Sequence, residues 1–229
     1  MLTKTFTPQR ENLGHQVYLY LRDRIYRMEI TPGTRLGVDK IAEEIGVSRS
    51  PVRDALMMLV NEGVIEVNAT GGYRVIQLNR SFIEDAFVVR RALELAAMRL
   101  AMGQLDRARI QALASQWANL QTSEPSDPAQ REQEILADQQ LHDTIAEMSQ
   151  NRLLIEALGR ITMITWLISR FSYANLAKPQ YAHLTAQEHL HLLQVMLSGD
   201  TETAVTALDE HLTNAFARSL ERLDSPKKV

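Results

Sequence analysis

The segment Gly46-Val-Ser-Arg-Ser-Pro-Val-Arg-Asp-Ala-Leu56 has the features of the turn and second helix of a DNA-reading helix-turn-helix. Glycine adopts the left-handed backbone conformation cheaply, so Gly46 can end the preceding helix. Ser48 carries a side-chain oxygen that can cap the next helix, and Pro51 falls within its first turn, where no backbone donor is missed. The segment therefore predicts two helices joined by a tight turn.

Two arginines, Arg49 and Arg53, lie four residues apart in the second of these helices, on the side opposite its apolar residues. Recognition helices enter the major groove by their N-terminal turns, where a guanidinium can bind O6 and N7 of guanine or a phosphate. Ser50 and Pro51 share this turn, so we count them with the arginines as candidate DNA contacts. For the segment taken alone, a solvated helix with two ordinary surface arginines is the alternative.

The pattern around this segment predicts a winged helix-turn-helix over residues 1–78. Helices are expected near 13–28, 38–45 and 48–62, and a hairpin is expected from two short extended pieces, 63–67 and 73–76. The hairpin tip ends in Gly71 and Gly72, and Arg74 follows, so this wing is a candidate for contact with the DNA backbone or minor groove. A plain hairpin turn needs glycine too, and that alternative stays open.

The remainder of the chain shows helical periodicity throughout, with no strand-like alternation after Ser81. Six helices are expected, bounded by caps and breakers, near 81–103, 105–121, 129–149, 151–176, 179–199 and 201–224. The predicted fold class is therefore mainly α, with an N-terminal winged helix-turn-helix and a C-terminal all-helical bundle over residues 81–224. The linker between the two domains is very short.

Composition restricts the function further. The chain has 229 residues and no cysteine, which excludes disulfides and thiolate metal sites. There is neither an 18-residue apolar run nor a signal-peptide pattern, so we expect no membrane span and a cytoplasmic location. The net charge of −3 is shared unevenly: residues 1–79 hold ten basic and nine acidic residues, and the rest holds fifteen and nineteen. This mild asymmetry permits DNA binding by the first domain.

Four side chains of the second domain could bind a divalent transition metal such as Zn²⁺, Ni²⁺ or Mn²⁺. Asp138 and His142 are one turn apart on the third predicted helix, and His189 and His211 lie on the fifth and sixth. Three imidazoles and a carboxylate that converge within a bundle suit such an ion. The alternative is an ordinary surface pair of Asp138 and His142, with the other histidines as half-buried polar residues.

Arg90 and Arg91 lie on the first predicted helix of the bundle, before Ala92-Leu-Glu94. A buried guanidinium beside a metal can hold the carboxylate of a small organic acid, which makes Arg90 a candidate effector contact. Either arginine could instead pair with Glu94 or lie at a dimer surface.

Together these motifs resemble the GntR family of bacterial transcription regulators. The resemblance covers nearly the whole chain. In the first domain it lies in Val47–Leu56, Asn61–Ile65 and Gly71–Val75, and in the second in Arg90–Glu94, Asp138–His142, Gln187–His189 and Glu210–Leu212. The second set is similar to the FadR-type (FCD) effector domain, and six helices with a minimal linker resemble its VanR-like subgroup.

The resemblance implies a homodimer that binds a near-palindromic operator in double-stranded DNA. It also implies that Asp138, His142, His189 and His211 bind the metal, and that Arg90 binds the effector, a small organic acid whose binding releases a repressor from DNA. One departure concerns DNA binding. The second helix opens with Val38 and Asp39 rather than an acidic-then-basic pair, so one DNA contact is either missing or moved to Lys40.

Two other functions remain as alternatives. A regulator of the same fold without metal could sense a larger ligand, such as an acyl thioester. A metal-dependent hydrolase could use the Asp and His set to activate water. The hydrolase lacks an obvious additional general base and would leave the DNA-binding motif without a role.

Overall fold

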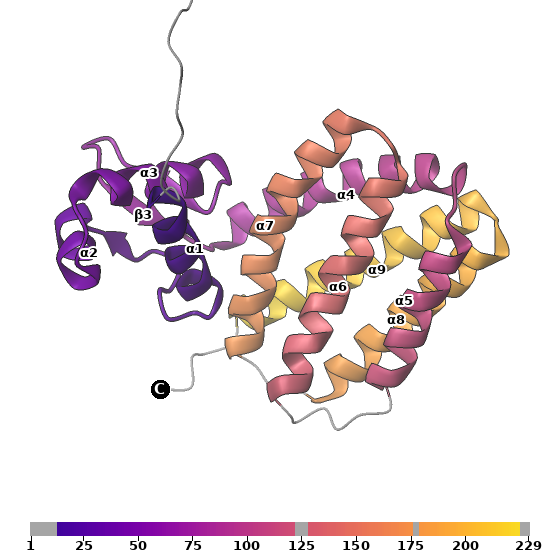
Figure 1. The fold of residues 1–229 in the computed structure, drawn as a ribbon. Helices are drawn as coiled ribbons and strands as arrows, with labels where there is room; N and C mark the ends of the chain where they lie inside the picture. The colour runs from indigo at the N-terminus through magenta and orange to yellow at the C-terminus, as the bar shows by residue number, and fades with distance from the viewer. Residues whose placement is uncertain (1–12, 122–127, 176–178, 225–229) are drawn as a thin grey trace, which may run out of the picture. The chain divides into compact units, whose positions relative to one another are not determined.

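The computed structural model describes residues 13–121, 128–175 and 179–224 (Figure 1). The chain divides into two compact units, Met1–Gln77 and Leu78–Val229. Within the described ranges, no helix has the length and apolar character needed to cross a membrane.

The first unit contains three helices and a small antiparallel sheet. The helices are α1 (Leu13–Tyr26), α2 (Val38–Ile45) and α3 (Arg49–Asn61), and the strands are β1 (Arg35–Leu36), β2 (Ile65–Val67) and β3 (Tyr73–Val75). The central strand is β3, in which Arg74 pairs with Arg35 on one side and Glu66 on the other. This order confirms the predicted winged helix-turn-helix.

The core of the first unit lies between α1 and α3. Val17, Leu21 and Ile25 form a buried stripe on α1, and Leu56 and Leu59 form its counterpart on α3. These residues recur every three or four positions, so one face of each helix is apolar and packs against the other. Burial of each such side chain stabilises the unit by roughly 1.5–3 kcal/mol, which holds α3 in place while its opposite face stays exposed.

The turn before α3 agrees with the prediction at Gly46 and differs from it at Ser48. Gly46 has φ 69° and ψ 33°, and its backbone N–H donates to the carbonyl oxygen of Ala42. Ser48 is the N-cap residue, but its side chain makes no capping hydrogen bond, so that part of the prediction was wrong. A capping oxygen accepts from the second or third helical N–H. Pro51 occupies the third position and has no N–H to donate.

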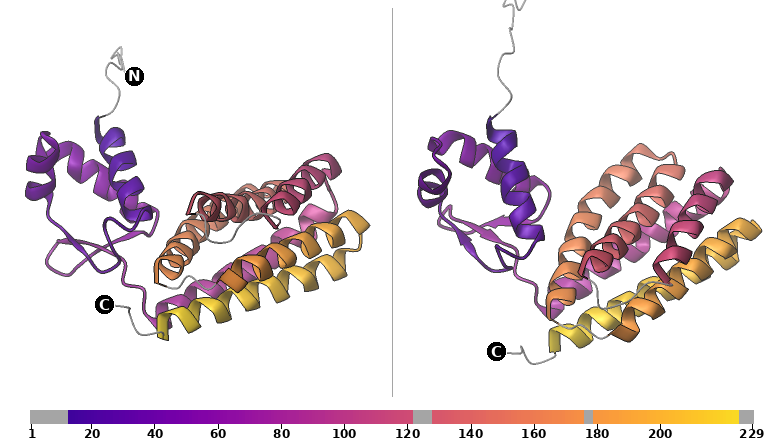
Figure 2. Two further views of the ribbon diagram at one scale, coloured as in Figure 1. Left: turned by 90° about the horizontal axis from the view of Figure 1, so that it is seen from below. Right: turned by 60° about the horizontal axis from the view of Figure 1, so that its bottom comes forward.

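The second unit is a bundle of helices. Among its described residues these are α4 (Arg80–Met102), α5 (Arg107–Gln121), α6 (Pro128–Met148), α7 (Arg152–Asn175), α8 (Pro179–Ser198) and α9 (Thr201–Asp224). Helix α4 packs against α6, α7 and α9, while α8 packs against α5 and α9. Figure 2 shows α8 and α9 lying side by side, with α6 and α7 in the other layer of the bundle. The helix boundaries agree with the predicted ones to within two residues.

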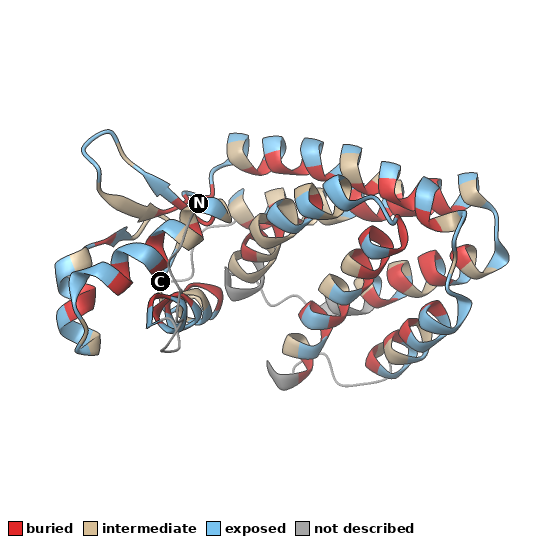
Figure 3. Ribbon diagram, turned by 45° about the horizontal axis from the view of Figure 1, so that its top comes forward, coloured by how far each residue is buried: buried red, intermediate tan, exposed pale blue. Residues whose placement is uncertain are grey.

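Apolar side chains from all six of these helices form the core of this unit. They include Met98 of α4, Ile110 and Trp117 of α5, Leu141 of α6 and Leu192 of α8, each fully buried. The buried residues lie on the inward faces of the helices and the exposed residues on the outward faces (Figure 3). Three histidines are buried beside this apolar core, and they define the site.

Candidate functional site

Four potential metal-binding side chains come together in the second unit. They are Asp138 and His142 of α6, His189 of α8 and His211 of α9, and one ligand atom from each lies within 4.8 Å of those from the others. The three imidazoles are 0–4% exposed. Asp138 and His142 share a face of α6 because they are four residues apart. The packing of α8 against α9 brings His189 and His211 together.

His142 is held by an acidic residue of the neighbouring helix α4. Its Nδ1 lies 2.5 Å from Oε2 of Glu94, and Oε1 of Glu94 accepts a 2.5 Å hydrogen bond from Nε of Arg90. Burial raises the pKa of Glu94, but the charges of Arg90 and His142 outweigh burial and lower the pKa to about 2. The ionised Glu94 therefore favours a proton on Nδ1 of His142, which leaves Nε2 directed toward the cluster.

His211 has an equivalent partner. Its Nδ1 lies 3.2 Å from Oε2 of Glu188, and Arg218 donates to both oxygens of that carboxylate. Burial raises the pKa of Glu188, but its hydrogen bonds to His211 and Arg218 lower it to about 2. Sequence reasoning missed this pair. Arg218 follows His211 by seven residues, which is two helical turns, and that spacing was the available signal.

His189 differs from the other two histidines because no carboxylate of the described residues is hydrogen-bonded to its Nδ1. Its Nε2 is 3.0 Å from Oδ1 of Asp138, and its ring stacks on the indole of Trp117. Burial lowers the pKa of His189, and it also lowers the pKa of His211, to about 3, with help from the adjacent His189. Both rings therefore favour the neutral form that binds metals.

His142, unlike His189 and His211, favours the protonated form. Burial lowers its pKa, but the charge of Glu94 outweighs burial and raises the pKa to about 9. A divalent cation and a proton would therefore compete for Nε2 of this ring.

The arrangement fits a divalent transition metal. Among the described residues, Nε2 of His142, His189 and His211 are buried without a hydrogen-bond partner, which is costly for a polar atom. Oδ1 of Asp138 lies 3.0 Å from Nε2 of His189 and 3.7 Å from Nε2 of His142. Ligands about 2.0–2.2 Å from one ion lie roughly 3–4 Å apart, and N and O donors of this kind suit Zn²⁺ and its neighbours.

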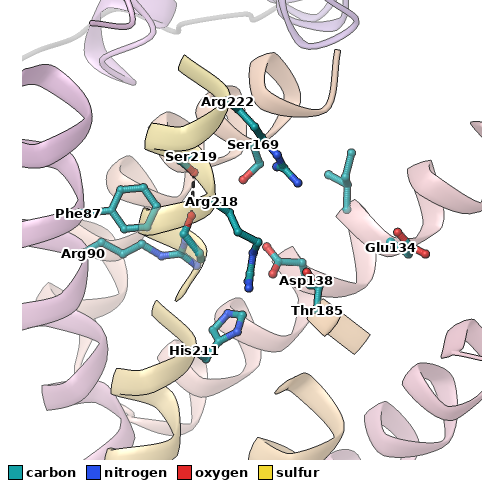
Figure 4. A pocket seen from close by; sticks show the side chains of 12 residues that line it. Phe87, Arg90, Glu134, Asp138, Ser169, Thr185, His211, Arg218, Ser219 and Arg222 are labelled. Atoms are coloured by element: carbon teal, nitrogen blue, oxygen red, sulfur yellow. Dashed lines mark hydrogen bonds between the residues drawn. The ribbon is translucent and has the colours of Figure 1, made fainter. Parts of the chain in front are cut away.

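A cavity of about 40 Å³ opens beside the cluster. Figure 4 shows Arg90, Arg218 and Asp138 extending toward the same space, next to His211. The other lining residues come from α4, α6, α7, α8 and α9 and are Phe87, Glu134, Ile135, Ser169, Thr185, Ala215, Ser219 and Arg222. A cavity of this size has room for a few water-sized groups, such as those of a carboxylate.

The two arginines considered on α4 have different surroundings. Arg90 is 6% exposed and uses Nε for Glu94 while it lines the cavity, so pairing with Glu94 and a place at the cavity occur together. Arg91 is exposed and forms a two-point ion pair with Asp209 of α9. Arg90 therefore remains the candidate for an effector carboxylate.

In the first unit, the predicted DNA contacts on α3 divide into exposed and buried residues. Arg49, Ser50 and Arg53 are exposed at its N-terminal end. Pro51 is buried, so its side chain does not face solvent with the others. Nε of Arg49 lies 2.6 Å from Oδ1 of Asp39, the residue at which α2 departs from the expected pattern.

The wing tip is closed by one side chain. Oδ1 of Asn68 accepts hydrogen bonds from Oγ1 of Thr70, at 2.8 Å, and from the backbone N–H of Gly72, also at 2.8 Å. A Cβ at Gly72 would lie 2.9 Å from Nδ2 of Asn68, and Gly71 has φ 79°. The left-handed backbone at Gly71 therefore favours glycine, and a side chain at Gly72 would displace Asn68 from the turn. Arg74 is half-buried in β3.

Comparison with known proteins identifies the family. A model of the FCD domain matches residues 85–214, and a model described as bacterial regulatory proteins, gntR family, matches residues 13–75. The chain belongs to the GntR family of transcriptional regulators, with an FCD domain. These families consist of regulators and not enzymes, so the hydrolase alternative is set aside for this GntR regulator.

Individual relatives span most of the GntR regulator. The HTH-type transcriptional repressor RspR of Escherichia coli strain K12 is 21% identical over 213 residues, covering 93% of this chain and 91% of RspR. The structure of E. coli McbR/YncC is similar with a TM-score of 0.76 and 22% identity, over 94% of this chain and 100% of that one. The zinc-bound FCD domain of TM0439 has a TM-score of 0.52 and 20% identity, over 64% and 97%.

Proposed function

We propose that this regulator is a homodimeric repressor whose operator binding is controlled by a small organic acid bound at a metal site. The observation that carries the proposal is the cluster of Asp138, His142, His189 and His211 beside a cavity into which Arg90 and Arg218 extend. The cluster supplies metal ligands, and the cavity supplies cations for a carboxylate.

In this proposal the four cluster residues bind one Zn²⁺, Ni²⁺ or Mn²⁺ ion. The buried and unpartnered Nε2 atoms of the three histidines support it, because a cation would satisfy them together. The zinc-bound FCD domain among the similar structures also supports it, since that protein shares the fold. Four protein ligands leave one position for the effector on a five-coordinate ion and two on an octahedral one.

The effector in this proposal is a small organic acid with a carboxylate bound by Arg90. The guanidinium of Arg90 uses Nε for Glu94, and its two terminal nitrogens remain for a planar anion. The cavity, of about 40 Å³, favours a small acid over an acyl thioester, whose nucleotide portion alone would need far more space.

The DNA contacts proposed are Arg49, Ser50 and Arg53 on α3, with Gly71, Gly72 and Arg74 of the wing approaching the backbone or minor groove. The exposure of the α3 residues at the helix N-terminus supports the first set, since helix-turn-helix proteins read the major groove with that end. Two-fold symmetric dimers bind near-palindromic operators for the same geometric reason. Repression is proposed because RspR, which is similar over most of its length, is named a repressor.

Effector control requires a difference in affinity. An acid that binds the DNA-competent and DNA-free states equally shifts neither, so it must prefer one of them. We propose that it prefers the state released from DNA, which makes the effector an inducer in the bacterial cytoplasm.

The proposal is tested by a thermal-shift screen of small organic acids on zinc-loaded and zinc-stripped protein, with elemental analysis of both. We expect stoichiometric metal, and a stabilisation that rises with acid concentration only in the loaded protein. An acid that passes the screen should also release labelled operator DNA. Protein without metal that still responds to the same acid would refute the metal-dependent part of the proposal.

A further inference from the structure

The three histidines of the cluster differ in what holds their rings. Nδ1 of His142 faces Glu94, and Nδ1 of His211 faces Glu188. In the part of the chain that the structure describes, His189 has no such partner, and neither of its ring nitrogens makes a hydrogen bond. A carboxylate at the far nitrogen normally fixes the orientation of a metal-binding imidazole. Something else must therefore orient His189.

The stacked ring of Trp117 on α5 is in a position to orient the imidazole of His189. Its ring centroid lies 4.0 Å from that of His189, with an angle of 25° between the ring planes. Both residues are fully buried, at 0% exposure. A flat surface at this distance restricts rotation of the imidazole out of its plane, so Nε2 stays directed toward Asp138, 3.0 Å away.

We propose that Trp117 is a positioning residue for the metal, acting by stacking on His189 in place of a carboxylate. This inference rests on the proposed metal site. The face of an indole is electron-rich, and an imidazole that gives its lone pair to a cation becomes electron-poor, so the attraction between the two rings increases when the metal binds.

The polar atom of Trp117 distinguishes this role from simple filling of the core. Nε1 of its indole is buried without a hydrogen-bond partner among the described residues. Burial of an unsatisfied N–H costs free energy, and an apolar side chain would fill the core without that cost. What tryptophan adds over leucine at this position is a broad π face toward His189.

Zinc affinity of the full-length protein tests the proposal. We would compare Trp117→Phe, which keeps an aromatic face, with Trp117→Leu, which does not, by competition with a chromogenic chelator. We expect the phenylalanine variant to stay within about threefold of the original protein and the leucine variant to bind zinc about tenfold more weakly or worse. The ligand-field absorption of bound Co²⁺ should change only in the leucine variant.

The control is Ile110→Ala, a core truncation two turns earlier on α5. It should lower the melting temperature of the metal-free protein and leave zinc affinity unchanged. A folded Trp117→Leu protein with the original zinc affinity and Co²⁺ spectrum would overturn the inference and leave the metal site standing. Failure of the original protein to bind zinc would overturn both.

A second measurement does not depend on the folding of the leucine variant. The chain has two tryptophans, so Trp166→Phe leaves Trp117 as the only indole. One equivalent of Zn²⁺, which is not itself a quencher, should then change the intensity or wavelength of Trp117 emission. Emission that stays constant while zinc binds would show that the stack does not sense the metal, and would overturn the inference.

Discussion

Arg218 donates through both terminal nitrogens to the two carboxylate oxygens of Glu188, at 2.8 Å each. The same carboxylate faces Nδ1 of His211, so Arg218 lies two contacts from this proposed metal ligand while it lines the proposed effector cavity. An anion in the cavity and the cation in the cluster are thereby linked through a single ion pair. Any effect of one on the affinity of the other must be reciprocal.

Replacement of Arg218 should therefore weaken metal binding without removing a ligand. In Arg218→Gln, Glu188 loses its two-point partner and holds His211 less firmly, so we expect the zinc dissociation constant to rise about tenfold or more. Competition with a chromogenic chelator measures it. Arg91→Gln is the control. It removes an exposed ion pair between α4 and Asp209 of α9, the helix that carries Arg218, and should leave zinc affinity unchanged. Equal affinity in the two variants would show that Glu188 does not need Arg218.

Metal removal should lower the stability of the second unit. A ligand that binds only the folded state adds about 2.7 kcal/mol to the free energy of unfolding at 100 times its dissociation constant. We expect a chelator to lower the melting temperature by several degrees, as followed by circular dichroism. The double variant His142→Gln/His189→Gln is the control, because its melting temperature should not respond to the chelator. A response of equal size in both proteins would place the chelated metal elsewhere.

Gly46 should be intolerant of a side chain for backbone reasons alone. Its φ is 69°, and a Cβ there would meet no atom within 4 Å, so Gly46→Ala introduces strain without a clash. The left-handed conformation costs a non-glycine residue about 1–2 kcal/mol, which urea denaturation would detect. Gly159→Ala in α7 is the matched control, because a Cβ there also meets nothing within 4 Å and its φ is not positive. That change should stabilise the protein by about 0.5–1 kcal/mol.

Operator binding should depend on Arg49 and Arg53 more than on other exposed arginines. If the guanidinium contacts a base, each substitution to alanine should weaken operator binding by about 1–3 kcal/mol. If it contacts a phosphate, the slope of log affinity against log salt concentration should fall by about one. Gel-shift titrations at several salt concentrations distinguish these cases. Arg27→Ala, at an exposed site paired with Asp23, is the control. An Arg49→Ala/Arg53→Ala protein that binds operator normally would exclude this helix end as the reading surface.

Local patterns in the sequence were sufficient to predict most of the fold. Helix periodicity and breakers placed α2 at its observed limits, Val38–Ile45, and the other helices within two residues. Gly46 was predicted correctly because the left-handed conformation depends on one residue type. The prediction for Ser48 was wrong although its position was right, since the missing donor belongs to Pro51 three residues later.

Only part of the candidate site could be predicted from local patterns in the sequence. Asp138 and His142 share a helix face, so their proximity follows from spacing alone. His189 and His211 were candidates by residue type, and the resemblance to the family strengthened their assignment. The structure brings all four together, and whether they bind metal stays a prediction. The contacts of Trp117 with His189 and of Glu188 with Arg218 join different helices. Such contacts depend on how helices pack, which residue spacing within one helix does not report.

The support of the cluster is distributed across the second unit. Glu94 comes from α4, Trp117 from α5, His142 from α6, Glu188 from α8 and His211 from α9. Opening of any one of these five helices would disturb a proposed ligand or its support, so we expect a bound ion to tie them into one cooperative unit. Backbone amides in all five should consequently slow their hydrogen exchange together when the ion is bound.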